Sequence, residues 1–187
     1  MIRNRTRCQL TLTALAVAML LCALPQAAMA ASPELSLIYP RGGQRGTEME
    51  VTFSGNRLKD TQEIIIYRPG IEVTKVEPDE NNRRVKATFK IAPDAPLGAY
   101  VMRVRTASGI SEAFTFNVGA LPIVDEKEPN SEFETPQAVP FNATVHGKVD
   151  NEDVDYYIIE AKKGDRLTAE VEGMRLRRKI FDAAVAI

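Results

Sequence analysis

The chain has 187 residues, with 24 basic and 25 acidic side chains, one histidine, two cysteines and no tryptophan. Apolar residues make up 44% of it, which is too high for an intrinsically disordered chain, and the nearly balanced charge excludes a polybasic nucleic-acid-binding protein. The length allows one or two small domains, because domains usually contain about 100–150 residues.

The N-terminus has the three parts of a secretory signal peptide. Arg3, Arg5 and Arg7 precede an uncharged run over residues 10–24, and an Ala-Met-Ala sequence follows at residues 28–30. A basic region, an apolar region and a small-x-small cleavage sequence together predict removal of residues 1–30. The alternative is a membrane anchor, but the run is shorter than the roughly 20 apolar residues that span a bilayer. Lipidation is not expected either, because Cys22 follows a leucine instead of a small residue.

Cleavage would leave residues 31–187, with 21 basic and 25 acidic side chains and no cysteine. The exported chain could then contain no disulfide, thiolate metal site or cysteine nucleophile. We expect it to be exported to the periplasm, cell surface or exterior, without a membrane segment after cleavage.

From residue 35 onward, apolar and polar residues alternate, which is typical of half-buried antiparallel strands. The clearest runs are residues 48–54, 85–91, 100–105 and 114–118. Glycine, proline, asparagine and aspartate separate them, as in β-sandwich domains. The sequence therefore predicts an all-β protein.

Composition changes near residue 121, which predicts two domains. Residues 31–120 carry 12 basic and 11 acidic side chains, whereas residues 121–187 carry 9 and 14. We predict a first β domain over 31–120, an acidic linker over 121–134, and a second β domain over 135–187 with strands near 145–149, 157–161 and 167–171. The last apolar run, 181–187, has no polar turn after it, so we expect the second domain to be truncated.

Glycines and prolines of the first domain carry a family resemblance. The relevant segments are residues 38–47, 51–58, 91–93, 98–100 and 107–109. Together they resemble IPT/TIG-type immunoglobulin-like domains, which implies an immunoglobulin-like β-sandwich over about residues 34–119.

The second domain has a different resemblance, carried by residues 128–130, 145–149, 153–157 and 163–167. These segments resemble the bacterial pre-peptidase C-terminal (PPC) domain. The resemblance implies a partial jelly-roll-like β-sandwich of the kind attached to secreted proteases and other exported proteins.

Catalytic residues are scarce. His146, in a predicted strand beside a turn, is better explained as a surface or pairing histidine than as a catalytic base, and no serine-hydrolase, zinc-protease or phosphate-loop motif is present. The basic residues of 175–179 lack interleaved aromatics, so we expect a solvated turn and no nucleic-acid site there. The chain as given is therefore not expected to be an enzyme.

Acidic residues in two segments predict a calcium site. Glu126, Glu128 and Asn130 alternate, so an extended backbone would direct them to one side, and residues 151–155 hold three further acids. Calcium prefers six to eight oxygen ligands, mainly from carboxylates, carbonyls and water. The alternative is an acidic, solvated linker that its own charges keep extended.

The resemblance to PPC domains of collagenases implies a particular ligand set. Matched by position, the calcium ligands would be Glu126, Glu128, Asn130, Glu152 and Asp155, with Asp153 as a substitute for Glu152.

Two functions remain from the sequence. The first is a non-catalytic binding or spacer module that engages a protein or polysaccharide polymer or a cell-surface component. The second is the N-terminal part of an exported hydrolase, such as a peptidase, whose catalytic domain lies beyond residue 187.

Export yields the first testable prediction. Expression with its own leader in a Gram-negative host should give a product that starts at Ala31, because the small-x-small sequence ends at Ala30. N-terminal sequencing checks this, and a product that retains Met1 would contradict it.

Overall fold

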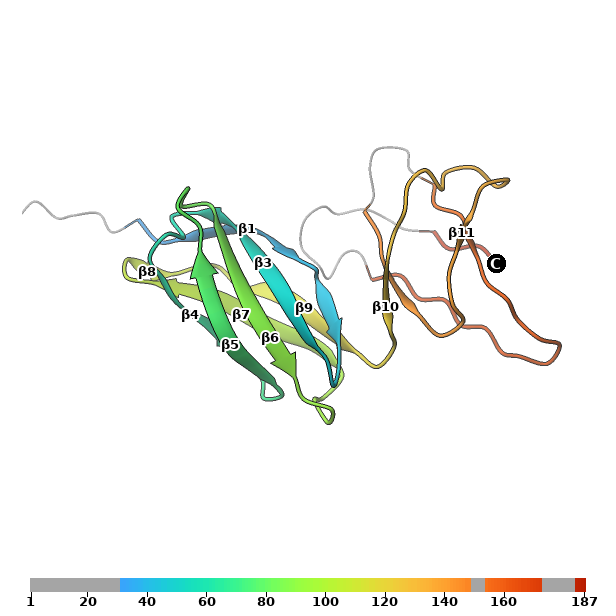
Figure 1. The fold of residues 1–187 in the computed structure, drawn as a ribbon, viewed down its shortest axis with the longest axis horizontal. Helices are drawn as coiled ribbons and strands as arrows, with labels where there is room; N and C mark the ends of the chain where they lie inside the picture. The colour runs from blue at the N-terminus through green and yellow to red at the C-terminus, as the bar shows by residue number, and fades with distance from the viewer. Residues whose placement is uncertain (1–30, 149–153, 173–183) are drawn as a thin grey trace, which may run out of the picture. The chain divides into compact units, whose positions relative to one another are not determined.

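The computed structural model describes residues 31–148, 154–172 and 184–187, so the predicted signal peptide lies outside the described residues. Every regular element in these ranges is a β-strand, which confirms the predicted all-β class (Figure 1). No helix in the described ranges is long and apolar enough to cross a membrane.

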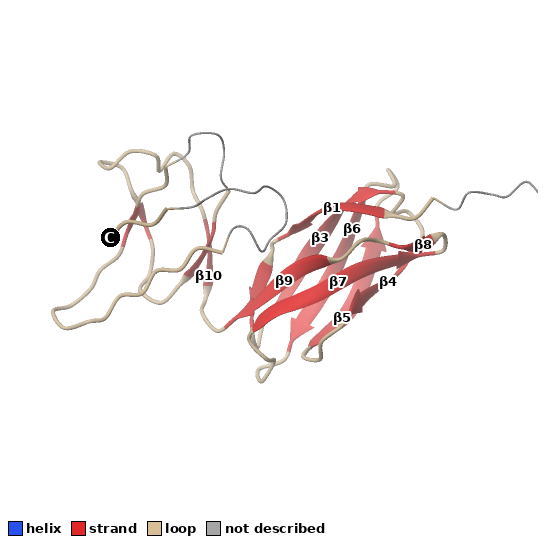
Figure 2. Ribbon diagram, turned by 180° about the vertical axis from the view of Figure 1, so that it is seen from behind, coloured by secondary structure: helices blue, strands red, loops and turns tan. Residues whose placement is uncertain are grey.

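Residues 34–119 form two facing sheets (Figure 1). The first sheet has four strands in the order β1 (Glu34–Tyr39), β3 (Glu48–Asn56), β6 (Arg84–Ile91) and β5 (Ile71–Pro78). The second has the order β2 (Gly42–Gln44), β9 (Phe114–Gly119), β7 (Gly98–Thr106) and β4 (Thr61–Ile66), with the short β8 (Gly109–Ile110) also paired to β7. From behind, β9, β7 and β4 lie in front of the first sheet (Figure 2).

The first stretch of chain is shared between the two sheets. β1 pairs antiparallel with β3, and after the cis Tyr39–Pro40 peptide the chain changes sheet, where β2 pairs parallel with β9. In the constant-type immunoglobulin sandwich a four-stranded sheet faces a three-stranded sheet. Here β1, β3, β6 and β5 form the four-stranded sheet, and β4, β7 and β9 form the three-stranded sheet, to which β2 is added beside β9.

The core lies between the sheets and follows from the alternation in the sequence. Phe53, Phe89 and Phe116 are fully buried, the first two from one sheet and the third from the other. Phe89 makes edge-to-face contacts with both neighbours, at ring-centroid distances of 6.0 and 5.6 Å. Such contacts add about 0.5–1.5 kcal/mol each beyond the burial of area.

The four runs predicted from alternation are strands β3, β6, β7 and β9. Strands β4 and β5 have no such strict pattern. β4 ends in three consecutive isoleucines, and in β5 a bulge between Val73 and Lys75 shifts the register, so that apolar residues stand three apart. A bulge inserts one residue into one strand of a pair, so the apolar residues on either side of it no longer alternate with a period of two.

Tyr100, near the start of β7, anchors the loop that precedes this strand. Its ring is fully buried, and its hydroxyl lies 2.9 Å from the carbonyl oxygen of Pro96 and 3.1 Å from that of Pro69. The Arg68 guanidinium lies over the ring, 5.0 Å from its centroid. A tyrosine at this place with a bond to backbone a few residues upstream is the tyrosine corner of immunoglobulin-like sandwiches.

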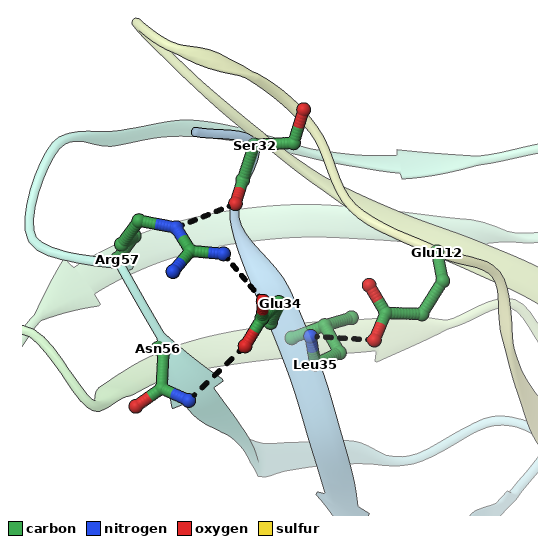
Figure 3. A network of polar contacts seen from close by, with 6 residues as sticks. All are labelled: Ser32, Glu34, Leu35, Asn56, Arg57 and Glu112. Atoms are coloured by element: carbon green, nitrogen blue, oxygen red, sulfur yellow. Dashed lines mark hydrogen bonds and ion pairs between the residues drawn. The ribbon is translucent and has the colours of Figure 1, made fainter. Parts of the chain in front are cut away.

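A polar network fixes the beginning of β1 (Figure 3). Arg57 donates to the Ser32 carbonyl at 2.7 Å and to the Glu34 carboxylate at 2.6 Å, and Asn56 donates to the other Glu34 oxygen at 3.3 Å. The Leu35 amide donates to Glu112, which lies between β8 and β9, at 3.1 Å. The Arg57 contact lowers the pKa of Glu34, so this carboxylate stays ionised at a lower pH than an ordinary glutamate does.

In the residues described after 120, two short parallel pairs form. β10 (Ile123–Asp125) pairs with β12 (Thr144–His146), and β11 (Gln137–Ala138) pairs with β13 (Tyr157–Ile158). β10 lies inside the segment predicted as a linker, 121–134: the backbone of Ile123–Asp125 pairs with β12, and three residues are too few to show a period in the sequence. The linker itself stays a prediction.

The prediction of a strand near residues 167–171 is wrong. These residues lie in no strand, and Leu167 and Val171 are exposed, so their alternation reflects no packing against a sheet. The jelly-roll arrangement of this second part stays a prediction, as does truncation of the run 181–187, whose first three residues lie outside the described ranges.

The tyrosine corner yields a prediction for Tyr100→Phe. Removing the hydroxyl removes the donor that the carbonyl groups of Pro69 and Pro96 share, so the free energy of unfolding should fall by about 0.5–1.5 kcal/mol. Urea unfolding measures this change. Tyr67→Phe is the control, because Tyr67 is 60% exposed and its hydroxyl should contribute little. Equal effects of the two substitutions would contradict the proposed anchor.

Candidate metal centre

The two parallel strand pairs bring separate acidic segments together. Glu126 directly follows β10, and its amide donates to the carbonyl of His146 in β12 at 3.1 Å. Asp155 lies two residues before β13, and the amide of Tyr156 donates to the carbonyl of Asn130 at 2.9 Å. These backbone bonds place the segment 126–130 beside the segment 155–157.

Three carboxylates meet at this place. One oxygen each of Glu126, Glu128 and Asp155 lies within 4.8 Å of the other two. Glu126 and Asp155 are half-buried, whereas Glu128 is exposed. The centre is therefore anionic, partly shielded from water and open on one side.

Glu126 receives hydrogen bonds on both carboxylate oxygens. The Tyr157 hydroxyl donates to one oxygen, and the Lys148 amide donates to the other at 2.6 Å. Burial raises the pKa of the Tyr157 phenol well above its ordinary value, and the Glu126 carboxylate raises it further, so the phenol stays protonated and remains a donor. Each carboxylate oxygen keeps a lone pair for a metal.

Asn130 adds a buried amide to the centre. The residue is fully buried, and neither its side-chain oxygen nor its side-chain nitrogen has a hydrogen-bond partner among the described residues. The side-chain amide of Asn130 interacts with the Tyr157 phenol and lowers its pKa, in opposition to the effect of burial. A buried amide without partners costs about 1–3 kcal/mol, so its presence calls for a ligand or an ordered water.

The donor set is composed of oxygen alone. Three carboxylates and an amide carbonyl are the ligands that calcium prefers, and it completes six to eight contacts with carbonyls and water. Zinc is less suited, because structural zinc sites use thiolate and imidazole ligands. The residues present therefore fit a calcium ion.

The structure brings together part of the ligand set predicted from the sequence. Glu126, Glu128 and Asp155 converge, and Asn130 is buried next to them. Glu152 and Asp153 lie outside the described residues, as does the basic segment 175–179. Tyr157 and the Lys148 amide were missed, because a hydroxyl donor from a neighbouring strand and a backbone donor leave no spacing signal in the sequence.

His146 is in β12, as predicted, but it is largely buried. Its side chain is 14% exposed, and Nδ1 lies 4.0 Å from a carboxylate oxygen of Asp125. Burial lowers the pKa of the imidazole, and the Asp125 charge acts in the opposite direction. The neutral form is therefore favoured in the folded chain.

No protein-family model matches the chain, and no curated protein matches it. Among solved structures, the chain is similar to SGBP-B from a complex xyloglucan utilization locus in Bacteroides uniformis, at 23% identity and a TM-score of 0.33 over 42% of this chain. It is also similar to the mixed-linkage glucan utilization locus SGBP-B of Bacteroides ovatus in complex with a mixed-linkage heptasaccharide, at 14% identity and a TM-score of 0.38 over 58% of this chain.

These likenesses concern the β fold alone. The matches extend over 21% and 26% of the two solved chains, so this chain spans about a quarter or less of their length.

His146 yields a prediction of pH dependence. Its pKa is 6.5 in the unfolded chain and lower in the folded chain, so the unfolded state binds more protons as the pH falls through this range. In the presence of chelator, the melting temperature should fall between about pH 7.5 and about pH 5.5, above the range in which most carboxylates titrate. His146→Gln should flatten this dependence.

Asp125→Asn provides the matched comparison. Removing the Asp125 charge removes the influence that raises the pKa of His146, so the fall in melting temperature should become steeper. The same pH dependence in all three proteins would contradict the assignment to His146.

Proposed function

We propose that this chain is an exported, non-catalytic binding or spacer module whose part after residue 120 binds calcium. The observation that carries the proposal is the convergence of Glu126, Glu128 and Asp155 within 4.8 Å. The buried Asn130 amide supports it independently. Glu152 and Asp153 are further candidate ligands in this proposal, on the basis of the sequence.

Electrostatics explains why a cation would stabilise this part of the chain. Two unit charges about 5 Å apart repel by about 1 kcal/mol in water and by about 3 kcal/mol at an effective dielectric constant near 20, and partly exposed carboxylates lie between these limits. A divalent ion replaces repulsion between the two segments by attraction to a common centre. It would therefore hold residues 126–130 against residues 155–157.

Calcium suits this centre better than magnesium. Magnesium requires a nearly ideal octahedron at about 2.1 Å and keeps most of its water, whereas calcium accepts irregular geometry at about 2.3–2.6 Å. Oxygens from three separate positions of the chain, one of them exposed, form an irregular set. Extracellular calcium modules typically have dissociation constants of about 10⁻⁴–10⁻³ M, which matches an exported location.

The immunoglobulin-like sandwich supplies a rigid body for such a module. We propose that the chain pairs an IPT/TIG-type domain with a PPC-type domain, and that its partner is a protein or polysaccharide polymer or a cell-surface component. Support for this pairing comes from the sequence segments that resemble the two families and from the immunoglobulin strand order of residues 34–119.

Thermal melting tests the calcium site. At about 5 mM calcium and a dissociation constant of about 10⁻⁴ M, binding should stabilise the chain by about 2 kcal/mol relative to chelator. For a chain of this size that corresponds to a rise of about 4–8 °C in the melting temperature. Calorimetry should give a matching heat of calcium binding.

Comparing Glu128→Gln with Glu132→Gln distinguishes specific calcium binding at the centre from nonspecific attraction to the acidic segment, because each substitution removes one negative charge from that segment. Glu128→Gln should weaken calcium binding by about tenfold or more while maintaining or raising the calcium-free melting temperature, since it relieves repulsion. Glu132→Gln should leave affinity within about twofold, because exposed charges interact weakly. Absence of both a melting shift and a binding heat in the parent chain would remove the site.

A further inference from the structure

The side chain of Gln137 makes a pair of hydrogen bonds that bracket Glu126. Its carbonyl oxygen accepts from the Lys127 amide at 2.8 Å, and its amide nitrogen donates to the Asp125 carbonyl at 3.0 Å. The groups that it engages belong to the residues immediately before and after Glu126. In a parallel sheet, a residue's backbone amide and carbonyl engage its neighbour strand in the same way, so Gln137 extends the pairing of β10 beyond its last residue.

Gln137 is itself fixed by the strand pair that carries the opposite part of the centre. It begins β11, its amide donates to the Tyr156 carbonyl at 2.9 Å, and its register partner in β13 is Tyr157. Tyr157 in turn donates its hydroxyl to Glu126. One residue therefore connects the backbone around Glu126 to the segment that contains Asp155.

The backbone at Glu126 is consequently held on several sides. Its own amide donates to the His146 carbonyl at 3.1 Å, and Gln137 holds the preceding carbonyl and the following amide. With these groups fixed, the Glu126 side chain has fewer orientations available and remains directed toward Tyr157 and the Lys148 amide. Holding a ligand in its binding geometry raises affinity by lowering the entropy lost on binding.

We propose that Gln137 is the positioning residue of the calcium centre: through paired backbone hydrogen bonds it presets Glu126 for binding without contacting the ion. This inference rests on the proposed function. It makes Gln137 part of the site, although its side chain is neutral.

Gln137→Met tests the inference, because methionine keeps the length of the side chain and removes both hydrogen bonds. Calcium affinity, measured by calorimetry well below the melting temperature, should fall about tenfold, which corresponds to about 1.4 kcal/mol. The matched control is Gln44→Met, which removes the bond from the Gln44 amide to the Ala120 carbonyl and should leave affinity unchanged.

A second measurement needs no substitution and no calcium. In the calcium-free parent chain, the Lys127 amide should be protected from hydrogen exchange, because its hydrogen bond ends on the Gln137 side chain. In Gln137→Met this protection should be lost. If the variant fails to fold, an unprotected Lys127 amide in the parent chain still overturns the proposal.

The outcomes separate the inference from the function on which it rests. If the parent chain gives no binding heat, the calcium site fails, and the role of Gln137 fails with it. If the parent chain binds calcium and Gln137→Met binds it equally well, only the positioning role is overturned. A lower calcium-free melting temperature with unchanged affinity also overturns it, because that result assigns Gln137 a structural role alone.

Discussion

Glu126, Glu128 and Asp155 approach within 4.8 Å of one another after residue 120, so the mutual repulsion of their carboxylates constrains how the segments 126–130 and 155–157 can meet. Like charges at this distance drive their segments apart unless hydrogen-bond donors or a cation offset them. Hydrogen-bond donors offset part of this repulsion: the Tyr157 hydroxyl and the Lys148 backbone amide bond to Glu126, and the backbone amide of Asn130 bonds to Glu128. The carboxylate oxygens nevertheless converge, and our proposal of calcium follows from that convergence.

The two parts of the chain obtain their order from different sources. Residues 34–119 bury an aromatic and aliphatic core between two sheets, with Phe89 in contact with rings from both. The residues that the structure describes after 120 form two short strand pairs, and several of their large apolar side chains, including Phe133 and Ile158, are exposed. Hydrophobic burial can stabilise the first part alone, whereas the second relies more on polar contacts, for which a bound ion would have a large effect.

The sequence predicted what depends on repeated side-chain patterns and missed what depends on single contacts. Alternation located β3, β6, β7 and β9, but the bulge in β5 and the short β10 left no period to detect. The spacing of Glu126 and Glu128 predicted that both face one side, because extended backbone places alternate residues on one side, whereas their approach to Asp155 was implied by the resemblance to PPC domains. Gln137 could not be found in this way, since its bonds go to backbone groups that every residue possesses.

The first stretch of chain contributes β1 to one sheet and β2 to the other, and this has a consequence for the order of folding. β1 pairs with β3, which is nearby in the chain, but the partner of β2 is β9. The pairing of Gly42 with Asn117 therefore cannot form before β9 is available. A chain that is made, or leaves a translocation pore, from its N-terminus can complete the β1–β3 hairpin early, whereas contacts of long sequence separation form late. β2 is thus among the first strands to emerge and among the last to be paired. Until β2 pairs, the edge of β9 remains open to pairing with other chains.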